Sequence, residues 1–387
     1  MDSSKLSVPV VILFLASVVP LISCDTVAPL CCFSRIFSFG DSNTDSGNNC
    51  LVNSACGANR LPYGETYFHK PSGRNSDGRI IVDFIAQAYG IPFQPPSKGG
   101  STAEYFKDGA NFAVAASQAL NNSAFKKLTN MNPWNTDSLS TQLQSLKNLL
   151  PTISQGSSVS AVMASSLFVV GEIGGVDYII GLANKKPMDE IRSWVPSVVD
   201  AIISALNDLI SLGATTLIVP GNYMFGCSPW FLLIYQSNNT ADYDNFGCIK
   251  SVNELSAYHN TMLMEELAKL RLLHPLINIV YADYYGAQSQ LYLNAQTLGF
   301  AAPLYACCGV AGQPYNMSLR IGCGSSGSQV CPDPSKYVSW DGDHLTEAAS
   351  HQIANGILYG PYSFPPFLQT AQTAKQELGS GVRQYLK

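Results

Sequence analysis

The strongest chemical feature of the sequence is a serine placed directly after a predicted strand. Ser42 lies in the segment FGDSNTDSGN, residues 39–48, and follows a short apolar strand predicted over 36–39. In open α/β sheets, sites form beyond the carboxyl ends of the strands. A serine flanked by small residues at such a place is accessible for attack on a carbonyl carbon. The alternative interpretation of this segment is a polar turn that ends the strand.

A nucleophilic serine needs a general base, and the base needs a group that orients it. The sequence contains five histidines, of which His344 is the best placed, just before the last predicted helix. Asp341 precedes it by three residues, so its carboxylate can fold back onto the imidazole within one loop. The pattern therefore predicts His344 as the base and Asp341 as the orienting group. Asp343 is the alternative carboxylate, although adjacent side chains usually diverge.

Four blocks resemble, in the same order, the motifs of the plant GDSL esterase/lipase family, which is part of the SGNH hydrolases. They are GDS at 40–42 with the extension DSGN at 45–48, GANFA at 109–113, FVVGEIGG at 168–175, and DGDHLTEA at 341–348. The likeness covers nearly all of the predicted mature chain. It implies a flavodoxin-like three-layer α/β/α fold and ester hydrolysis that needs no metal or organic cofactor.

The resemblance also implies a role for each matching residue. Ser42 is expected to be the nucleophile, His344 the base and Asp341 its partner. The backbone N–H groups of Ser42 and Ala116 are expected to form the oxyanion hole, which stabilises the negative oxygen of the tetrahedral intermediate.

Two residues depart from the family pattern. The family usually has glycine at the position of Ala116, where a main-chain donor survives the change. The third block usually reads Gly-x-Asn-Asp, whereas residues 174–177 here read GGVD, so Val176 supplies no side-chain amide. Losing one oxyanion donor costs about 2.7–4 kcal/mol of transition-state stabilisation. For Asp177, which keeps its family position, a structural role is expected.

Strands and helices alternate along the chain. Continuous apolar runs at 167–170, 216–220 and 277–281 are typical of buried parallel strands. Helical spacing of apolar residues is found at 80–89, 195–212, 255–273 and 346–358. This alternation predicts βαβ units around a mainly parallel sheet. Loops rich in Gly, Pro and Asn are expected to be insertions around one core, so we predict a single domain over residues 25–387; the loops are 57–76, 93–101 and 309–336.

Composition excludes several classes of protein. Charged residues are only 13% of the chain and hydrophobic residues 46%, which favours a compact enzyme-like body over a disordered protein. The net charge of −5 lacks the basic face that a general nucleic-acid binder needs. Runs of Lys and Arg that could hold the protein on a membrane surface are absent as well.

The N-terminus has the features of a secretory signal peptide. Lys5 precedes an apolar stretch over 8–19, and small residues follow at Ser23 and Cys24. We expect cleavage near Cys24, with Ala28 as the alternative site, and an uncleaved anchor as the alternative interpretation. The prediction is a signal peptide over residues 1–24 and passage through the secretory pathway to the cell exterior or the vacuole, with no stable membrane anchor.

Cysteine usage agrees with an oxidising compartment. Removing Cys24 with the signal leaves ten cysteines, an even number that is expected to form mostly disulfides. Near neighbours suggest two pairs, Cys50 with Cys56 and Cys323 with Cys331. A zinc site is the alternative, although no paired CxxC pattern occurs. Sequons for N-glycosylation stand at Asn121, Asn238 and Asn316.

Together these features predict a carboxylic-ester hydrolase that acts on a small-molecule ester through an acyl-enzyme on Ser42. An acyltransferase that uses the same acyl-enzyme is one alternative. A weakly catalytic binding protein, suggested by Val176, is the other. Several aromatic residues are expected either to line an apolar pocket or to pack in ordinary core and loop positions: Tyr63, Tyr67, Phe68, Trp134 and Trp230. The sequence leaves the substrate and the oligomeric state open.

Overall fold

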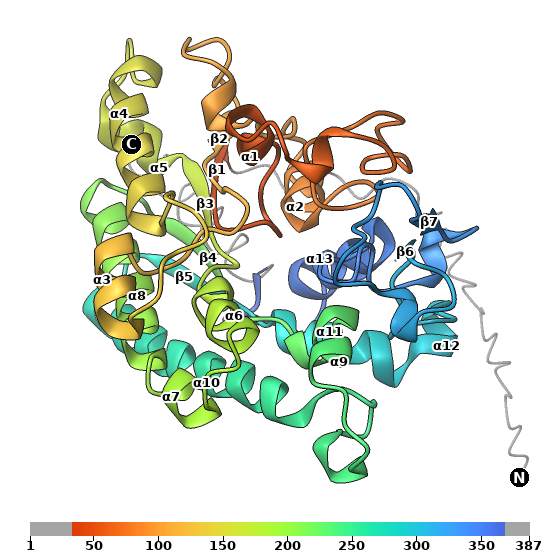
Figure 1. The fold of residues 1–387 in the computed structure, drawn as a ribbon. Helices are drawn as coiled ribbons and strands as arrows, with labels where there is room; N and C mark the ends of the chain where they lie inside the picture. Colours follow the sequence, from red (N-terminus) through yellow and green to blue (C-terminus); the bar gives the residue numbers. More distant parts are fainter. Residues whose placement is uncertain (1–32, 368–387) are drawn as a thin grey trace, which may run out of the picture.

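The computed structural model describes residues 33–367, and a six-stranded sheet lies at its centre in the order β2-β1-β3-β4-β5-β8 (Figure 1). Strands β1 to β5 are parallel, and β8 pairs antiparallel with β5 at one edge. The order 2-1-3-4-5 is that of flavodoxin-like folds, so the predicted α/β/α architecture is confirmed. The strands are β1 (Arg35–Phe39), β2 (Gly109–Asn111), β3 (Ser166–Val170), β4 (Thr216–Pro220), β5 (Asn278–Ala282) and β8 (Ser363–Phe364).

Alternating side chains of the buried strands divide the core into two layers. Phe37 of β1 and Phe168 of β3 are register partners and stack with ring centroids 5.5 Å apart on one face of the sheet. Their neighbours Ile36 and Leu167 pack into the separate core on the other face. Successive residues of a strand point to opposite faces, so fully apolar strands require helices on both sides.

Helices cover both faces of the sheet. One core contains side chains of α2 (Ile81–Ala88), α11 (Tyr284–Leu293) and α13 (Glu347–Leu358). The opposite core contains side chains of α4 (Leu139–Ile153), α5 (Val159–Ala164), α6 (Gly175–Ala183), α8 (Val195–Ser211) and α10 (Lys250–Leu273). Shorter elements lie in the connections: α1 (Asn48–Val52), α3 (Asn122–Thr129), α7 (Met188–Arg192), α9 (Pro229–Ile234), α12 (Ala295–Leu298), β6 (Cys308–Gly309) and β7 (Gln329–Val330).

The predicted strands agree with the observed ones to within one residue. The long helix predicted from residue 255 begins five residues earlier, at Lys250. Strand β2 was not predicted as a strand, because it has only three residues and lacks an apolar run. Gly109 in β2 has φ 113°, and a Cβ there would lie 1.9 Å from the carbonyl oxygen of Ile36. Only glycine therefore allows β2 to pair this closely with β1.

One helical stretch of the described chain, Met188–Ser211, is long and apolar enough to cross a membrane by length and composition. One side of α8 within it is buried in the core, including Val198, Ile202 and Leu206. Packing against the sheet therefore accounts for its apolar composition. The predicted signal peptide, residues 1–24, lies outside the described residues, so the domain limits of 25 and 387 stay a prediction.

Four disulfides are formed among residues 33–367. Cys50 pairs with Cys56 as predicted, and Cys227 pairs with Cys248. The predicted Cys323–Cys331 pair is wrong: the pairs are Cys307–Cys331 and Cys308–Cys323. The antiparallel pairing of β6 with β7 brings Cys331 to Cys307, whose carbonyl oxygen accepts the Cys331 N–H at 2.7 Å. Cys31 and Cys32 lie outside the described residues.

Candidate active site

Ser42 lies in the turn that follows β1, and three neighbouring residues hold this turn. Gly40 has φ 152°, and a Cβ there would lie 2.8 Å from the carbonyl oxygen of Glu172, so glycine is required for the close approach of the two loops. Gln142 of α4 accepts the Gly40 N–H at 2.9 Å and donates to the Gly40 carbonyl at 2.8 Å. Asn75 donates its Nδ2–H to the Ser42 carbonyl at 3.3 Å. The backbone of Ser42 is thus fixed from outside the motif that contains it.

The Asp45 carboxylate joins the turn after β1 to the loop after β2. Its Oδ1 accepts the N–H groups of Gly47 at 2.7 Å and Asn48 at 2.6 Å. Its Oδ2 accepts the N–H groups of Asn49 at 3.0 Å and Ala115 at 2.9 Å. Four donors on one fully buried carboxylate satisfy the amides that start α1 and place Ala115 and Ala116 beside Ser42.

His344 and Asp341 form the hydrogen-bonded pair that their spacing predicts. Nδ1 of His344 lies 3.0 Å from Oδ1 and 2.9 Å from Oδ2 of Asp341. Oδ1 also accepts the backbone N–H of His344 at 2.9 Å and that of Asp343 at 3.1 Å. The Asp343 carboxylate instead lies 3.9 Å from Nε2, on the other side of the ring. Asp341, and not Asp343, therefore orients the imidazole.

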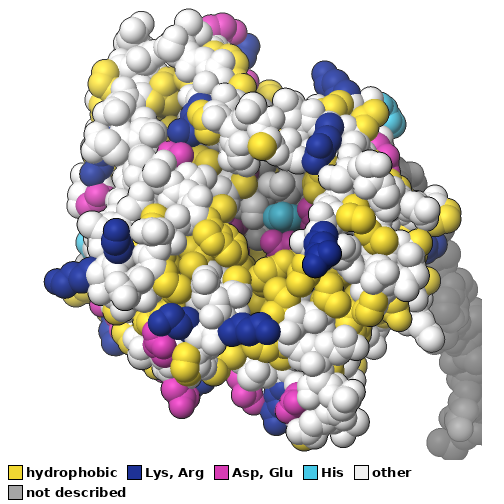
Figure 2. All heavy atoms as spheres, in the orientation of Figure 1, with side chains coloured by type: hydrophobic (Ala, Val, Ile, Leu, Met, Phe, Trp, Pro, Cys, Tyr) yellow, Lys and Arg dark blue, Asp and Glu magenta, His cyan; other side chains and the backbone are white. Residues whose placement is uncertain are grey.

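Ser42 and His344 line the same cavity, which has a volume of about 190 Å³. Figure 2 shows a hollow with a histidine and acidic side chains inside it and hydrophobic side chains around it. Apart from the residues already described, side chains after β2, β3 and β4 line the cavity; they include Ala116, Trp134, Val176, Ile179, Tyr223, Met224, Phe225 and Ser228. The site therefore lies at the carboxyl ends of the strands, where the sequence places it.

Nε2 of His344 is buried and has no hydrogen-bond partner among the described residues. Ser42 Oγ likewise forms no hydrogen bond within residues 33–367, so the two atoms share the cavity without bonding to each other. Hydrogen bonds between a nucleophile and its base are often long in a free enzyme and shorten when substrate binds.

The backbone of Ala116 explains the family's preference for glycine at this position. Its φ is 64°, in the left-handed region that non-glycine residues adopt at a cost. Within the described chain, neither the Ala116 N–H nor the Ser42 N–H donates to a protein acceptor. Both residues line the cavity, so both donors can serve an oxyanion there.

Val176 and Asp177 differ in where their side chains go. Val176 lines the cavity and offers it only methyl groups. The buried carboxylate of Asp177 accepts the N–H groups of Ala119 at 2.8 Å and Leu120 at 3.2 Å, which ties α6 to the loop after β2. This geometry gives Asp177 a structural role, in agreement with the expectation from the sequence.

The carboxylates around His344 control its charge. Burial alone would lower the pKa of His344, but the charges of Asp341, Asp343 and Asp41 raise it to about 9. Burial opposes ionisation of Asp341, yet His344 and the backbone N–H groups lower the pKa of Asp341 to about 2. The pair therefore rests as an imidazolium and a carboxylate at neutral pH, and His344 becomes a proton acceptor in alkaline solution.

Two buried carboxyl groups, those of Asp41 and Glu172, lie at the turn that contains Ser42, where the Asp41 N–H donates to the Glu172 carbonyl at 3.2 Å. Desolvation raises the pKa of Asp41, and it raises the pKa of Glu172 further, with the charge of Asp41 adding to the effect. Glu172 accepts the Gly175 N–H at 3.1 Å, and Asp41 accepts the Asn43 N–H at 2.9 Å. Two like charges this close in a buried site are unfavourable, so the pair retains a proton at neutral pH.

The remaining sequence predictions fall in different places. Trp134 lines the cavity, whereas Tyr67 and Phe68 pack with Phe93 outside it, and Trp230 packs on Phe231. Tyr63 does not line the cavity but donates a hydrogen bond to Asp341.

The three sequon asparagines differ in accessibility. Asn121 and Asn238 are exposed, and Asn316 is half-buried with its Nδ2 donating to the Ala306 carbonyl at 3.2 Å. Among residues 33–367, one group of metal-ligand types comes together, Cys227, Asp244 and Cys248, but its two cysteines are joined in a disulfide.

The residues that hold the serine turn, Gln142 and Asn75, were not predicted from the sequence. Gln142 and Asn75 act through backbone atoms 102 and 33 positions away, and isolated Gln or Asn residues carry no pattern. Asn48 and Asn111 could have been found from the sequence, because both lie in blocks that resemble the family motifs. Asn48 donates to the carbonyls of Asn111 and Ala113, and this explains why the blocks DSGN and GANFA occur together.

Comparisons with known proteins agree with this geometry. The model of the GDSL-like lipase/acylhydrolase family matches residues 36–357. A GDSL esterase/lipase of Arabidopsis thaliana is 44% identical over 92% of this chain and 91% of its own length. A second one from Arabidopsis thaliana is 45% identical over 87% of this chain and 86% of its own length. The sinapine esterase of Brassica napus is 42% identical, with 87% of each chain covered. The chain therefore belongs to the plant GDSL esterase/lipase family and is a serine carboxylic-ester hydrolase.

Proposed function

We propose that Ser42 is the nucleophile of ester hydrolysis, with His344 as its general base and Asp341 as the group that orients the base. Ser42 attacks the ester carbonyl carbon while Nε2 of His344 takes the hydroxyl proton. His344 then returns this proton to the leaving alcohol, and a water molecule hydrolyses the acyl-enzyme by the same route. The backbone N–H groups of Ser42 and Ala116 stabilise the oxyanion in both steps.

One observation carries this proposal. A single cavity contains Ser42, the ring of His344 that Asp341 holds by Nδ1, and two backbone N–H groups without protein acceptors. These are the parts that acyl transfer to a serine requires, and they come from segments about 300 positions apart in the chain.

Covalent labelling with a fluorophosphonate tests the nucleophile. The wild-type protein is expected to be labelled once, and Ser42→Ala is expected to lose both labelling and ester hydrolysis. Ser228→Ala is the matched control, because Ser228 lines the same cavity but caps α9 by accepting the Phe231 N–H. Equal labelling of wild type and Ser42→Ala would remove Ser42 as the nucleophile.

We propose further that the substrate is a small ester whose alcohol carries a positive charge, such as the acetate of an alkaloid. The sequence resembles acetylajmalan esterase as well as the sinapine esterase found by comparison. The cavity supports a cationic group, because Asp343 and the ring of Trp134 both line it. Among the described residues, no Lys or Arg lines this cavity.

A pair of isosteric esters tests the charge preference. Acetylthiocholine carries a quaternary ammonium group, and 3,3-dimethylbutyl thioacetate has the same shape without the charge. Wild type is expected to hydrolyse the cationic ester with a higher kcat/KM, and Asp343→Asn is expected to reduce this ratio. Equal kcat/KM for the two esters in wild type would reject a cationic substrate and leave Ser42 chemistry untouched.

We also propose that the mature protein begins near Cys24, passes through the secretory pathway and carries N-glycans. Four disulfides support an oxidising compartment. Asn121 and Asn238 are the most accessible sequon positions, and Asn316 is the least accessible. N-terminal sequencing of the secreted protein and glycopeptide mass spectrometry test these proposals, and an unprocessed Met1 or unmodified sequons would contradict them.

A further inference from the structure

We propose that Tyr63 is a positioning residue for the general base, so that a chain of three side chains, Tyr63–Asp341–His344, sets the orientation and basicity of the imidazole. This inference rests on the proposed roles of Ser42 and His344. Tyr63 contacts neither the serine nor the cavity, and it acts through Asp341.

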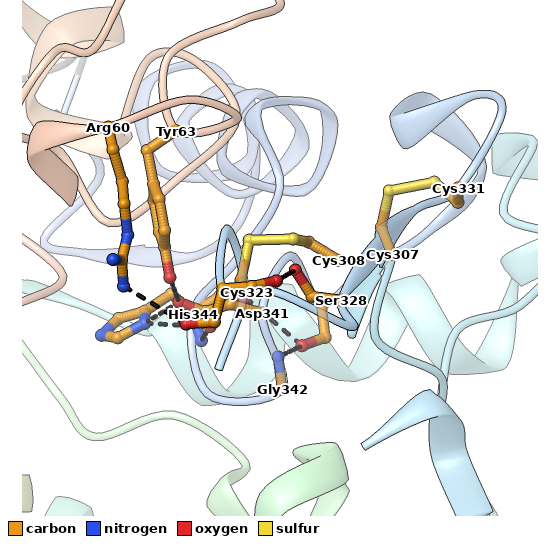
Figure 3. Close-up of a disulfide and its surroundings, with 12 residues drawn as sticks. Arg60, Tyr63, Cys307, Cys308, Cys323, Ser328, Cys331, Asp341, Gly342 and His344 are labelled. Atoms are coloured by element: carbon orange, nitrogen blue, oxygen red, sulfur yellow. Dashed lines mark hydrogen bonds and ion pairs between the residues drawn. A yellow bond between two sulfur atoms is a disulfide. The ribbon is translucent and has the colours of Figure 1, made fainter. Parts of the chain in front are cut away.

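The hydrogen bonds of the Asp341 carboxylate show what Tyr63 contributes. Oη of Tyr63 donates to Oδ2 of Asp341 at 2.8 Å (Figure 3). Oδ1 is held by two backbone N–H groups, those of Asp343 and His344. Among residues 33–367, Tyr63 is therefore the donor that holds Oδ2 besides the imidazole. Without it, Oδ1 stays held by the backbone, and Oδ2 keeps the imidazole as its donor, so more of the carboxylate's negative charge acts on His344.

The position of Tyr63 is itself well defined. Its side chain is 6% exposed, and its ring meets that of Trp340 edge to face, with centroids 6.1 Å apart and planes at 80°. Trp340 immediately precedes Asp341 and is fully buried. Both rings belong to a small core with the buried cysteines Cys56, Cys307, Cys308 and Cys323. A phenol packed in this way delivers its hydroxyl to one point in space, which a positioning residue requires.

The surroundings also keep the Tyr63 hydroxyl protonated. Burial and the charge of Asp341 raise the pKa of Tyr63 well above its ordinary value, while Arg60 lowers it by a smaller amount. The hydroxyl is therefore a donor over the whole pH range in which an esterase works. Without this donor, the Asp341 carboxylate would keep more of its negative charge and would attract the proton of His344 more strongly.

Few charged groups surround the three side chains of Tyr63, Asp341 and His344. Asp341, Asp343 and Asp41 act on His344, and Arg60 and Asp343 act on Tyr63 together with Asp341. Replacing Tyr63 by phenylalanine changes none of these charges. Its effect on the pH dependence of activity therefore reports on the hydrogen bond alone.

The experiment compares wild type with Tyr63→Phe over a full pH profile of kcat/KM for a neutral short-chain ester. Tyr63→Phe is expected to lower the limiting kcat/KM about tenfold, the size of one buried hydrogen bond to a charged group. The midpoint of its rising limb is expected to move to higher pH, because His344 becomes harder to deprotonate. Tyr235→Phe is the matched control, since Tyr235 also donates a partly buried hydrogen bond, to the Leu182 carbonyl at 2.9 Å, away from the site.

A second variant keeps the test decisive if Tyr63→Phe folds poorly. Site-specific 3-fluorotyrosine at position 63 has a more acidic hydroxyl, which donates more strongly, and is expected to move the midpoint to lower pH. An unchanged midpoint in both variants would overturn the inference, whatever happens to stability. Fluorophosphonate labelling of the same samples, compared with Ser42→Ala, tests separately whether Ser42 is the nucleophile. A failure of that proposal is therefore distinguished from an unchanged midpoint.

Discussion

At the scale of single residues, the charge of His344 decides when the site can work. Three carboxylates raise its pKa to about 9, and only the neutral imidazole can accept the serine proton. If His344 is the proposed base, activity is expected to be low where His344 is protonated and to rise as the pH passes through its pKa. One of these carboxylates, Asp343, does not hold Nδ1 and has its Oδ2 3.9 Å from Nε2.

We therefore predict that kcat/KM for a neutral ester rises with pH to a midpoint near 9 in the wild type. Asp343→Asn removes one negative charge and is expected to move this midpoint down by about half a unit, because the partly exposed pair is screened by solvent. Asp200→Asn, an exposed change on α8, serves as the control and should leave the profile unchanged. A wild-type midpoint near 6.5 would contradict the assigned charge of the site.

Val176 offers a second prediction at this scale. It lines the cavity where the family has an asparagine, so Val176→Asn is expected to restore a donor and raise kcat by at least about tenfold. The same change places a polar group in a site that is only 4% exposed and should cost about 1–2 kcal/mol of stability. Steady-state kinetics and urea unfolding measure both effects. Val176→Ala supplies no donor, and an equal gain in that control would assign the effect to space instead.

At the scale of elements, the His344 loop is held between a disulfide-rich insertion and α13. The N–H groups of Cys307 and Cys308 donate to the carbonyls of Ser339 at 3.0 Å and Trp340 at 2.6 Å. On the other side, Thr346 caps α13 by accepting the Ala349 N–H at 3.1 Å. A loop without regular structure thus gains fixed ends, which lets it position Asp341 and His344 (Figure 3).

We predict that the double variant with Cys308→Ser and Cys323→Ser has a lower free energy of unfolding and a looser Asp341–His344 contact. Opening a loop of this length is expected to cost about 3 kcal/mol. Because the Asp341–His344 contact loosens, the midpoint of the pH profile should fall toward the ordinary value for histidine. Cys227→Ser with Cys248→Ser, which lie in another cluster, should lose stability while keeping the midpoint. Equal midpoints in the two double variants would show that the insertion does not support the base.

At the scale of the whole molecule, buried ionisable groups couple folding to pH. Burial raises the pKa of Asp45 to about 6 and that of Asp177 to about 7, and it also raises those of Asp41 and Glu172. A carboxyl group with a raised pKa stabilises the fold while protonated, and this stability is lost as the pH rises. His344 acts in the same direction between its unfolded value and about 9. His259, whose pKa burial lowers to about 3, acts in the opposite direction only below about pH 6.5.

The free energy of unfolding is therefore expected to fall by about 3 kcal/mol between pH 6 and pH 8.5. Urea unfolding with intact disulfides, followed by circular dichroism at both pH values, measures this difference. His344→Asn should reduce it, because the histidine contributes to the slope above pH 6.5. A stability that stays constant or rises over this interval would show that the carboxyl groups are less buried than the fold places them. Stability and activity are therefore expected to have different pH optima in this protein.

Features that depend on neighbours along the chain could be predicted from the order of the residues. Apolar runs alternating with helical spacing were enough for the α/β/α fold, because each strand and helix must bury its own apolar face. Ser42 at the end of a strand and Asp341 three residues before His344 were visible for the same reason. Strand β2 was lost because three residues, one of them Gly109, carry no pattern of burial. These predictions needed only local geometry and the rule that sites form at strand ends.

Which distant groups meet depends on how the chain packs in three dimensions. Tyr63 and Asp341 are 278 positions apart, and a single tyrosine gives no sign of its hydrogen-bond partner. Cys323 and Cys331 are near neighbours in sequence, yet they do not pair with each other. Cys307 and Cys308 are adjacent residues of an extended chain, so their side chains point to opposite sides. Cys307 therefore pairs with Cys331 and Cys308 with Cys323. Such choices depend on how loops pack over the ends of the sheet, and packing is a property of the whole fold.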